Sequence, residues 1–158
     1  MKSKITSLKA LTEIRKKLKK QGKKVAFTNG CFDILHRGHV TYLQKARSFG
    51  DVLVLGLNRD ASIRRIKGND RPINNEKDRA VVVSALECID YVVLFGEDTP
   101  LRLIKTLKPD ILVKGSDWAI DEIVGKDVLD AYGGKVKRVK LVQGRSTTNV
   151  IDKIKKAK

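Results

Sequence analysis

The fold of this chain is decided by residues 24–39, KVAFTNGCFDILHRGH. The first four residues are rich in β-formers and predict a buried strand. Residues 40–49 repeat apolar side chains at helical spacing and are followed by Gly50, a residue typical of helix C-termini. The stretch between them is therefore the first strand-to-helix turn of an α/β unit, on the rim where open α/β sheets bind their ligands.

Both histidines of the protein, His36 and His39, lie in this turn. Their spacing of three residues lets the two rings face the same way at the start of the helix. Free backbone N–H groups and the positive end of the helix dipole attract anions to the same place. Gly30 and Gly38 allow tight turns and a close approach of the backbone to a phosphate. The pattern predicts a phosphate site.

Two other interpretations of the histidine pair stay open. The rings could cap a turn without binding anything, or they could hold zinc together with Cys31 or Asp33. Structural zinc usually takes four Cys or His ligands, and the chain has no third histidine and no Cys-x-x-Cys motif. The phosphate interpretation is therefore favoured.

The length and composition of the chain set outer limits on its function. A chain of 158 residues forms one domain with a substantial core. It has no apolar run near the length of a membrane span and no signal peptide, so we expect no membrane association and a cytoplasmic location. Its two cysteines give no disulfide framework, which fits a reducing compartment.

The net charge of +16 lies almost entirely at the two ends of the chain. Residues 1–24 contain ten basic residues and one acid, and residues 135–158 contain nine and one. Residues 25–134, between these ends, contain 15 basic residues and 16 acidic ones. This distribution does not predict a basic groove for nucleic acid, so a nucleic-acid-binding protein that uses its lysine-rich ends is only an alternative.

Alternating strand and helix patterns continue through the rest of the chain. We expect strands at 51–57, 90–95, 109–113 and 135–142, and helices at 61–66, 75–88, 99–107, 121–132 and 149–156. Residues 7–20 are amphipathic, so residues 1–22 should form a helix packed on a domain spanning 23–158. The expected fold class is α/β, a single Rossmann-like domain with a parallel five-stranded sheet and helices on both faces. Neither a Gly-x-Gly-x-x-Gly fingerprint nor a P-loop is present.

Polar residues after the other predicted strands should gather on the rim of the sheet that carries the histidines. They are Asn58, Asp60, Lys67, Arg71 and Arg79 after the second strand, Lys114, Gly115, Asp117 and Trp118 after the fourth, and Ser146, Thr147 and Thr148 after the fifth. So many cations beside two helix N-termini suit a triphosphate accompanied by Mg²⁺. The only tryptophan, Trp118, either fills the core or lines a base pocket.

The histidine turn resembles the His-x-Gly-His signature of the nucleotidyltransferase superfamily, in its cytidylyltransferase-like branch. In that family the two histidines contact the nucleotide phosphates and stabilise the transition state. Arg79 matches the family's helical arginine, and Ser146-Thr147-Thr148 matches the Ser-Thr-Thr that holds the triphosphate. Further stretches are most similar to the adenylyltransferase domain of ADP-heptose synthases: 67–68, 71–74, 97–100, 108–115 and 146–149.

This resemblance implies an enzyme that joins ATP and D-glycero-D-manno-heptose 1-phosphate to give ADP-heptose and pyrophosphate, for lipopolysaccharide or other cell-surface heptose. Ser116-Asp117-Trp118 is closer to the cytidylyltransferases. The alternative is therefore an enzyme using CTP and glycerol 3-phosphate or a similar alcohol phosphate. The resemblance also implies a homodimer. Many members are fused to a sugar kinase, and none is seen here, so we expect a stand-alone form.

Each predicted site residue then has a role. His36, His39, Lys67 and Arg79 are the expected catalytic residues, with His39 nearest the α-phosphate. The expected nucleotide-binding residues are Thr28, Asn29, Gly30, Phe32, Asp33, Gly38, Lys114, Gly115, Asp117, Trp118, Ser146, Thr147 and Thr148. Asn58, Asp60 and Arg71 are expected to bind the sugar phosphate. Mg²⁺ is the expected cofactor, held without a complete set of protein ligands, and Asp33 is the one candidate ligand.

Overall fold

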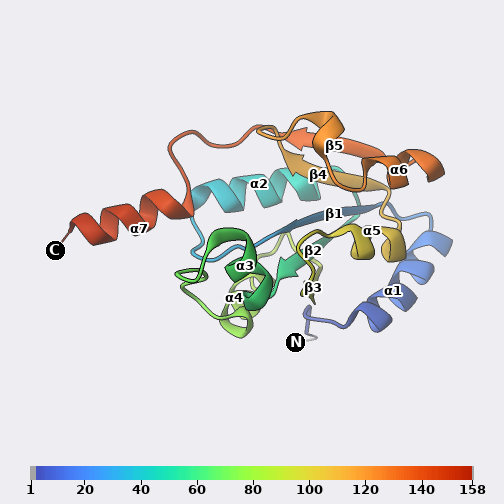
Figure 1. Cartoon of the computed structure of the whole chain (residues 1–158). Coiled ribbons are helices and arrows are strands. Elements are labelled where there is room, and N and C mark those ends of the chain that lie inside the picture. The colour runs from blue at the N-terminus through green and yellow to red at the C-terminus, as the bar shows by residue number, and fades with distance from the viewer. Residues whose placement is uncertain (1–2, 158) are drawn as a thin grey trace.

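Five parallel strands form the centre of the computed structural model, which describes residues 3–157 (Figure 1). The strands are β1 (Val25–Gly30), β2 (Val52–Asn58), β3 (Tyr91–Phe95), β4 (Ile111–Gly115) and β5 (Lys135–Val139). Their order in the sheet is β3-β2-β1-β4-β5, and every pairing is parallel. The expected α/β, Rossmann-like fold is confirmed.

Helices cover both faces of this sheet. They are α1 (Leu8–Lys20), α2 (Arg37–Arg47), α3 (Asp60–Lys67), α4 (Glu76–Ser84), α5 (Leu101–Leu107), the short 3₁₀ helix η1 (Ile120–Glu122), α6 (Lys126–Tyr132) and α7 (Thr147–Lys156). Leu43 of α2 and Val83 of α4 pack on one face. Leu11 of α1, Ile104 of α5 and Leu129 of α6 pack on the other. Each face of the sheet thus carries one apolar cluster. Successive residues of a strand belong alternately to the two clusters, because side chains along a strand point to opposite faces.

Several elements differ from the sequence expectation in their extent. The helix expected over 121–132 is split into η1 and α6, because Gly125 has φ +92° and a Cβ there would lie 2.6 Å from Ile104 Cδ1. The strand expected to reach 142 ends at Val139, and the helix expected to reach 88 ends at Ser84. The last helix begins at Thr147 rather than 149, and Ser146 caps it by accepting the Asn149 N–H at 3.0 Å.

The order of the strands creates a crevice above β1 and β4. The chain adds β2 and β3 on one side of β1 and then crosses to place β4 on the other. Loops above the carboxyl ends of β1 and β4 therefore diverge, as is typical of ligand sites in open α/β sheets. The histidine turn, which joins β1 to α2, opens into this crevice.

The two edge strands of the sheet, β3 and β5, differ in what lies along their outer sides. Residues 4–6 extend the β3 edge: Val92 donates its N–H to the Lys4 carbonyl, and Thr6 donates to the Val92 carbonyl, both at 2.9 Å. The outer edge of β5 instead carries the exposed side chains of Lys135, Lys137 and Arg138.

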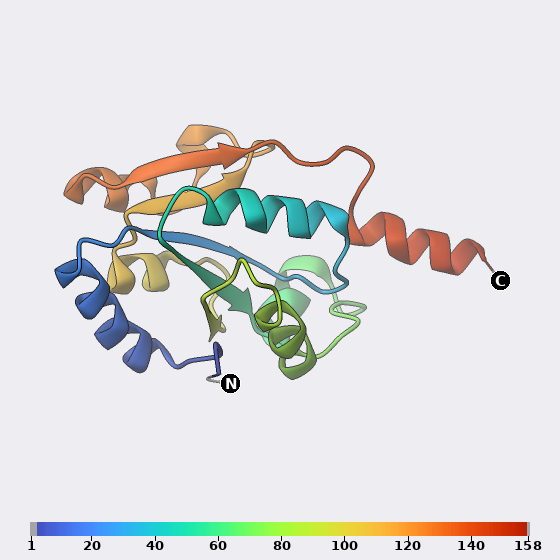
Figure 2. The same cartoon turned by 180° about the vertical axis from the view of Figure 1, so that it is seen from behind.

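Helix α7 extends away from the rest of the molecule, as two opposite views show (Figure 1, Figure 2). None of its described residues is buried. Within residues 3–157, no helix combines the length and the apolar character needed to cross a bilayer.

Candidate active site

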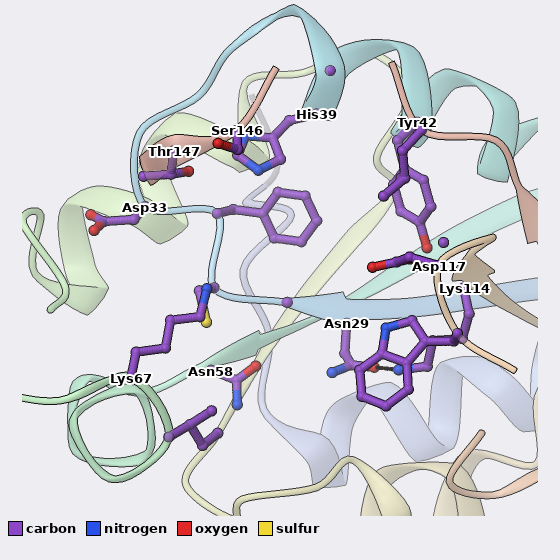
Figure 3. A pocket seen from close by; sticks show the side chains of 18 of the residues that line it. Asn29, Asp33, His39, Tyr42, Asn58, Lys67, Lys114, Asp117, Ser146 and Thr147 are labelled. Carbon is purple, nitrogen blue, oxygen red and sulfur yellow. Dashed lines mark hydrogen bonds between the residues drawn. The ribbon is translucent and has the colours of Figure 1, made fainter. Parts of the chain in front are cut away.

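A pocket of about 550 Å³ lies at the carboxyl ends of β1 and β4 (Figure 3). Its volume is in the range of small-molecule sites. Most of the residues expected from the sequence line it: Asn29, Gly30, Phe32, Asp33, His36, Gly38, His39, Asn58, Lys67, Arg71, Lys114, Gly115, Asp117, Trp118, Ser146, Thr147 and Thr148. The rule that parallel strands bring their following loops to one rim therefore located the pocket.

The two histidine rings stack on each other at the start of α2. Their centroids are 3.8 Å apart, and the ring planes are inclined by 25°. The Phe32 ring also packs against the His39 ring, with a centroid distance of 5.1 Å. A Cβ on Gly38 would come within 2.9 Å of His36 Cε1, so Gly38 is needed for the stacking itself.

A backbone hydrogen bond fixes the tautomer of His36. His36 is the N-cap of α2, and its Nδ1 accepts the Gly38 N–H at 3.1 Å. A neutral imidazole that accepts at Nδ1 carries its proton on Nε2. His36 Nε2 and His39 Nδ1 are both buried without a hydrogen-bond partner among residues 3–157. Because buried polar atoms are costly to leave unpaired, these two nitrogens favour a ligand in the pocket.

The surroundings of the pair favour neutral rings. Burial, with smaller contributions from the nearby His36 and Lys67, lowers the pKa of His39 to about 4. Burial and Arg145 also lower the pKa of His36 from its ordinary value of 6.5. At neutral pH the two rings are therefore uncharged hydrogen-bonding groups.

We expect the His39 ring of the free protein to titrate near pH 4 in an NMR titration of its ring signals, and His36 to titrate below 6.5. As the pH falls from 6.5 to 4, the unfolded chain takes up the His39 proton before the folded one. This histidine therefore makes the fold less stable across that window, and its effect levels off below pH 4. A His39 midpoint at or above 6.5 would contradict the buried, neutral ring.

The N-terminus of α7 meets the histidines at the pocket. Ser146 and Thr147 lie beside His39 in Figure 3, and they line the pocket with Thr148. The Ser146 hydroxyl is occupied as the helix cap, whereas the first turn of α7 has N–H groups free for an anion. Two helix N-termini, those of α2 and α7, thus border one pocket.

Beneath the pocket, a polar chain joins β1, α2 and β4. Thr28 is fully buried, and its hydroxyl lies 2.8 Å from the Tyr42 hydroxyl, which donates to the Val113 carbonyl at 3.1 Å. Burial raises the pKa of Tyr42 to about 12. Thr28 was expected to bind nucleotide, but the structure places it below the pocket as support.

Lys114 lies in the pocket and donates a hydrogen bond to the side-chain oxygen of Asn29. Because an ammonium group only donates, this contact turns the amide N–H₂ of Asn29 away from Lys114. Burial lowers the pKa of Lys114 to about 8. Asn29 is thereby fixed as a donor at the carboxyl end of β1.

Arg79 is not a pocket residue, contrary to the sequence expectation of a phosphate contact. Its side chain is buried, and its guanidinium donates to the carbonyls of Cys31, Asn58 and Asn74 and to the Asp60 carboxylate. These bonds engage all three nitrogens of the guanidinium. Asp60, expected to bind substrate, lies outside the pocket and pairs with Arg79 at 2.8 Å instead.

The Asp33 carboxylate is likewise engaged by the protein. It accepts hydrogen bonds from Arg71, from the Ile73 N–H and from the Asn74 N–H. This arrangement does not suit the magnesium ligand considered from the sequence. Within residues 3–157, no group of three or more His, Cys, Asp or Glu side chains is arranged to hold a metal ion.

Several pocket residues were not given a role in the site from the sequence. They are Cys31, Tyr42, Ile66, Asp98, Thr99, Pro100, Ile123, Val124, Leu141, Val142 and Arg145. Residues 98–100 follow β3, so the rule that identified the loops after β2 and β4 would also have found them. Tyr42 lies one helical turn after His39, a spacing that also marks the same face of α2.

The pocket has two chemically different sides. Towards β5 it is lined largely by apolar side chains, those of Trp118, Ile123, Val124, Leu141 and Val142. Trp118 is half exposed, so it is not core filler. Towards α3 and the loop after β3 it is more polar, with Asn58, Lys67, Arg71, Asp98 and Thr99. The histidine pair lies in the turn after β1, the central strand.

Comparisons with known proteins agree with this geometry. A cytidylyltransferase-like family model matches residues 27–154. The bifunctional protein HldE of Geobacter metallireducens is 62% identical over 155 residues, which are 98% of this chain and 32% of that protein. HldE of Geobacter sulfurreducens is 61% identical over the same length. The chain thus spans about a third of the curated relatives it matches.

Solved structures agree on the fold. A lipopolysaccharide core biosynthesis protein from Thermoplasma volcanium superposes with a TM-score of 0.64 and 32% identity, over 78% of this chain and all of that one. Pantoate-β-alanine ligase from Francisella tularensis, crystallised with an ATP analogue, shares the fold at 17% identity, with a TM-score of 0.65. The family model, the first of these structures and the histidine turn lead to one conclusion: this chain belongs to the cytidylyltransferase-like family and is a nucleotidyltransferase.

Proposed function

We propose that this nucleotidyltransferase joins ATP and D-glycero-D-manno-heptose 1-phosphate into ADP-heptose. The observation that carries the proposal is the stacked histidine pair, whose unpaired nitrogens lie beside two helix N-termini. The choice of substrates is supported by the similarity to ADP-heptose synthases in residues 67–68, 71–74 and 108–115. It is also supported by the 62% identity to HldE and by a relative named for lipopolysaccharide core biosynthesis.

In the proposed reaction, an oxygen of the sugar phosphate forms a bond to the α-phosphorus of ATP. The bond from that phosphorus to the bridging oxygen breaks, and pyrophosphate leaves with the electron pair. A phosphate nucleophile is already an anion at neutral pH, so the reaction needs no general base. What the protein must supply is alignment of two anions that repel each other, and donors where charge develops.

Different pocket residues are assigned to binding the phosphates and to stabilising the leaving pyrophosphate. The Nε2–H of His36 and the ring of His39 contact the phosphates, with His39 nearest the α-phosphate. Lys67 and the first turn of α7, with Thr147 and Thr148, stabilise the leaving pyrophosphate. In the free protein, burial lowers the His39 pKa to about 4, so the ring meets the nucleotide as a neutral hydrogen-bonding group.

The two sides of the pocket suit the two substrates. We assign the nucleotide base to the apolar side, where the exposed face of Trp118 offers a stacking surface. The sugar phosphate is assigned to the polar side, near Asn58, Lys67 and Arg71. Asn29, held by Lys114, donates between them.

Mg²⁺ is proposed to enter with the triphosphate. Since the described residues provide no cluster of metal ligands, its coordination would come mainly from phosphate oxygens and water, an arrangement that Mg²⁺ accepts readily. When bound, the ion would neutralise part of the triphosphate charge.

A pyrophosphate-release assay tests the function. Each of ATP, CTP, GTP and UTP is combined with heptose 1-phosphate or with glycerol 3-phosphate, in the presence of Mg²⁺. We expect the highest kcat/KM with ATP and heptose 1-phosphate. Faster turnover of CTP with glycerol 3-phosphate would replace the proposed substrates with the cytidylyltransferase pair, and the absence of pyrophosphate release in every combination would refute both.

A further inference from the structure

The loop between α3 and α4, residues 68–75, follows Lys67 and is held from below by one buried carboxylate. The Asp33 side chain is fully buried. Its Oδ2 accepts the Ile73 N–H at 2.7 Å and Arg71 Nε at 3.1 Å, and its Oδ1 accepts the Asn74 N–H at 2.8 Å. Asn74 also donates its side-chain amide to the Asp33 carbonyl at 2.8 Å. A single residue of the histidine turn thus holds the second half of this loop.

Arg79 provides an independent tie between the same two segments. Its Nη1 donates to the Cys31 carbonyl at 2.6 Å, and its Nε donates to the Asn74 carbonyl at 3.0 Å. Its Nη2 donates to the Asn58 carbonyl, at the end of β2, at 2.8 Å. Only 1% of the residue is exposed. The guanidinium therefore joins the histidine turn, the end of β2 and the loop after α3 in one buried network.

The first half of the loop has no comparable support. Residues 67–70 are exposed, and Gly68 has φ +97° with nothing within 4 Å of where a Cβ would lie. Lys67 lies at the junction, as the last residue of α3, and lines the pocket. Because Lys67 connects α3 to this loop, a movement of the loop would be transmitted to its side chain.

We propose that Asp33 and Arg79 are positioning residues, which tie the loop after α3 to the histidine turn and thereby hold Lys67 over the pocket. Both act through the loop, because the charged groups of their side chains are hydrogen-bonded to the protein itself. The part of this inference that concerns catalysis rests on the proposed function, because it uses the role of Lys67 at the phosphates. The tie itself is a property of the free protein.

Limited trypsin digestion without substrates tests the tie, since Lys67 is a cleavage site at the start of the segment, whereas the Arg71–Pro72 bond resists trypsin. Asp33→Asn keeps the volume of the side chain but places an N–H₂ group against backbone N–H donors. We expect cleavage after Lys67 to become about tenfold faster or more, because cleavage follows the population of the locally open form. Cleavage within α1 should stay unchanged. Asn74→Ala, on an exposed residue, removes one bond of the same tie and should give a smaller acceleration if Asp33→Asn does not fold.

Glu76→Gln is the matched control. Glu76 pairs with Arg59 and accepts the Asp60 N–H, so it ties α4 to the start of α3 without touching the histidine turn. It should leave cleavage after Lys67 near the wild-type rate. Unchanged cleavage in both Asp33→Asn and Asn74→Ala would overturn the tie, even in a protein that releases no pyrophosphate.

Arg79→Lys tests the catalytic consequence in the active enzyme. It keeps the charge but cannot reach three carbonyls at once. We expect kcat to fall at least tenfold while the KM for ATP changes little, since the nucleotide contacts themselves stay in place. Faster cleavage combined with wild-type kcat, in this variant and in Asp33→Asn, would show that the loop is tied but that Lys67 does not depend on it, and would overturn the proposal.

Discussion

Replacing His39 by alanine is expected to lower kcat by about 10²–10³-fold. A preorganised hydrogen-bonding group aimed at developing charge typically contributes roughly 2.7–4 kcal/mol to transition-state stabilisation. His39 is held for such a role: its ring contacts the rings of both His36 and Phe32, and its Nδ1 has no partner among the described residues. Steady-state pyrophosphate release at saturating substrates measures the change in kcat.

Arg37→Ala is the control for this variant. Arg37 is exposed in the first turn of the same helix and does not line the pocket. It should keep kcat within about twofold, because an exposed side chain outside the pocket adds little to transition-state stabilisation. A His39→Ala enzyme with wild-type kcat and an intact thermal transition would remove this ring from the mechanism.

Replacing Lys67 by alanine is expected to lower kcat by about 10²-fold. Its ammonium group is near enough to the histidines to lower the His39 pKa, and it is exposed rather than neutralised by a buried acid. A cation in this position stabilises charge that moves onto the leaving pyrophosphate. The effect should appear in kcat more strongly than in the KM for ATP, since charge on the leaving group grows in the transition state.

Arg64→Ala gives the matched comparison for Lys67→Ala. It removes one positive charge from the same helix at an exposed position outside the pocket. If the two variants reduced kcat equally, the effect would come from the general positive potential of α3 and not from Lys67 itself. If both variants had the kinetics of the wild-type enzyme, Lys67 would be a surface lysine without a role in catalysis.

Much of the fold follows from short-range patterns in the sequence. Each predicted strand is present, because continuous apolar runs such as 52–55 can be buried only inside a sheet covered on both faces. The predictions of helix and strand boundaries fail where contacts with distant parts of the chain determine the local structure. Gly125 breaks the helix expected over 121–132 because Ile104, from another helix, occupies the space that a side chain would need.

The pocket could be located from the sequence, but the partners of its charged residues could not. Loops after parallel strands must meet at one rim, so Lys67, Lys114 and Thr147 were found together. The same rule predicted that Arg79 and Asp33 would face the ligand, but both side chains are buried and bind other parts of the protein. Which carbonyls surround a guanidinium depends on segments that are far apart in the chain, such as Cys31 and Asn74 for Arg79.

The protection of both edge strands, β3 and β5, affects the behaviour of the protein at high concentration. An open strand edge invites a strand from another molecule, which leads to aggregation. The β3 edge is already capped by residues 4–6, and an incoming strand at β5 would have to pack against the charges of Lys135 and Lys137. We therefore expect that removing residues 1–6, or changing both lysines to valine, would make the protein prone to intermolecular β-pairing, from which the native chain is protected.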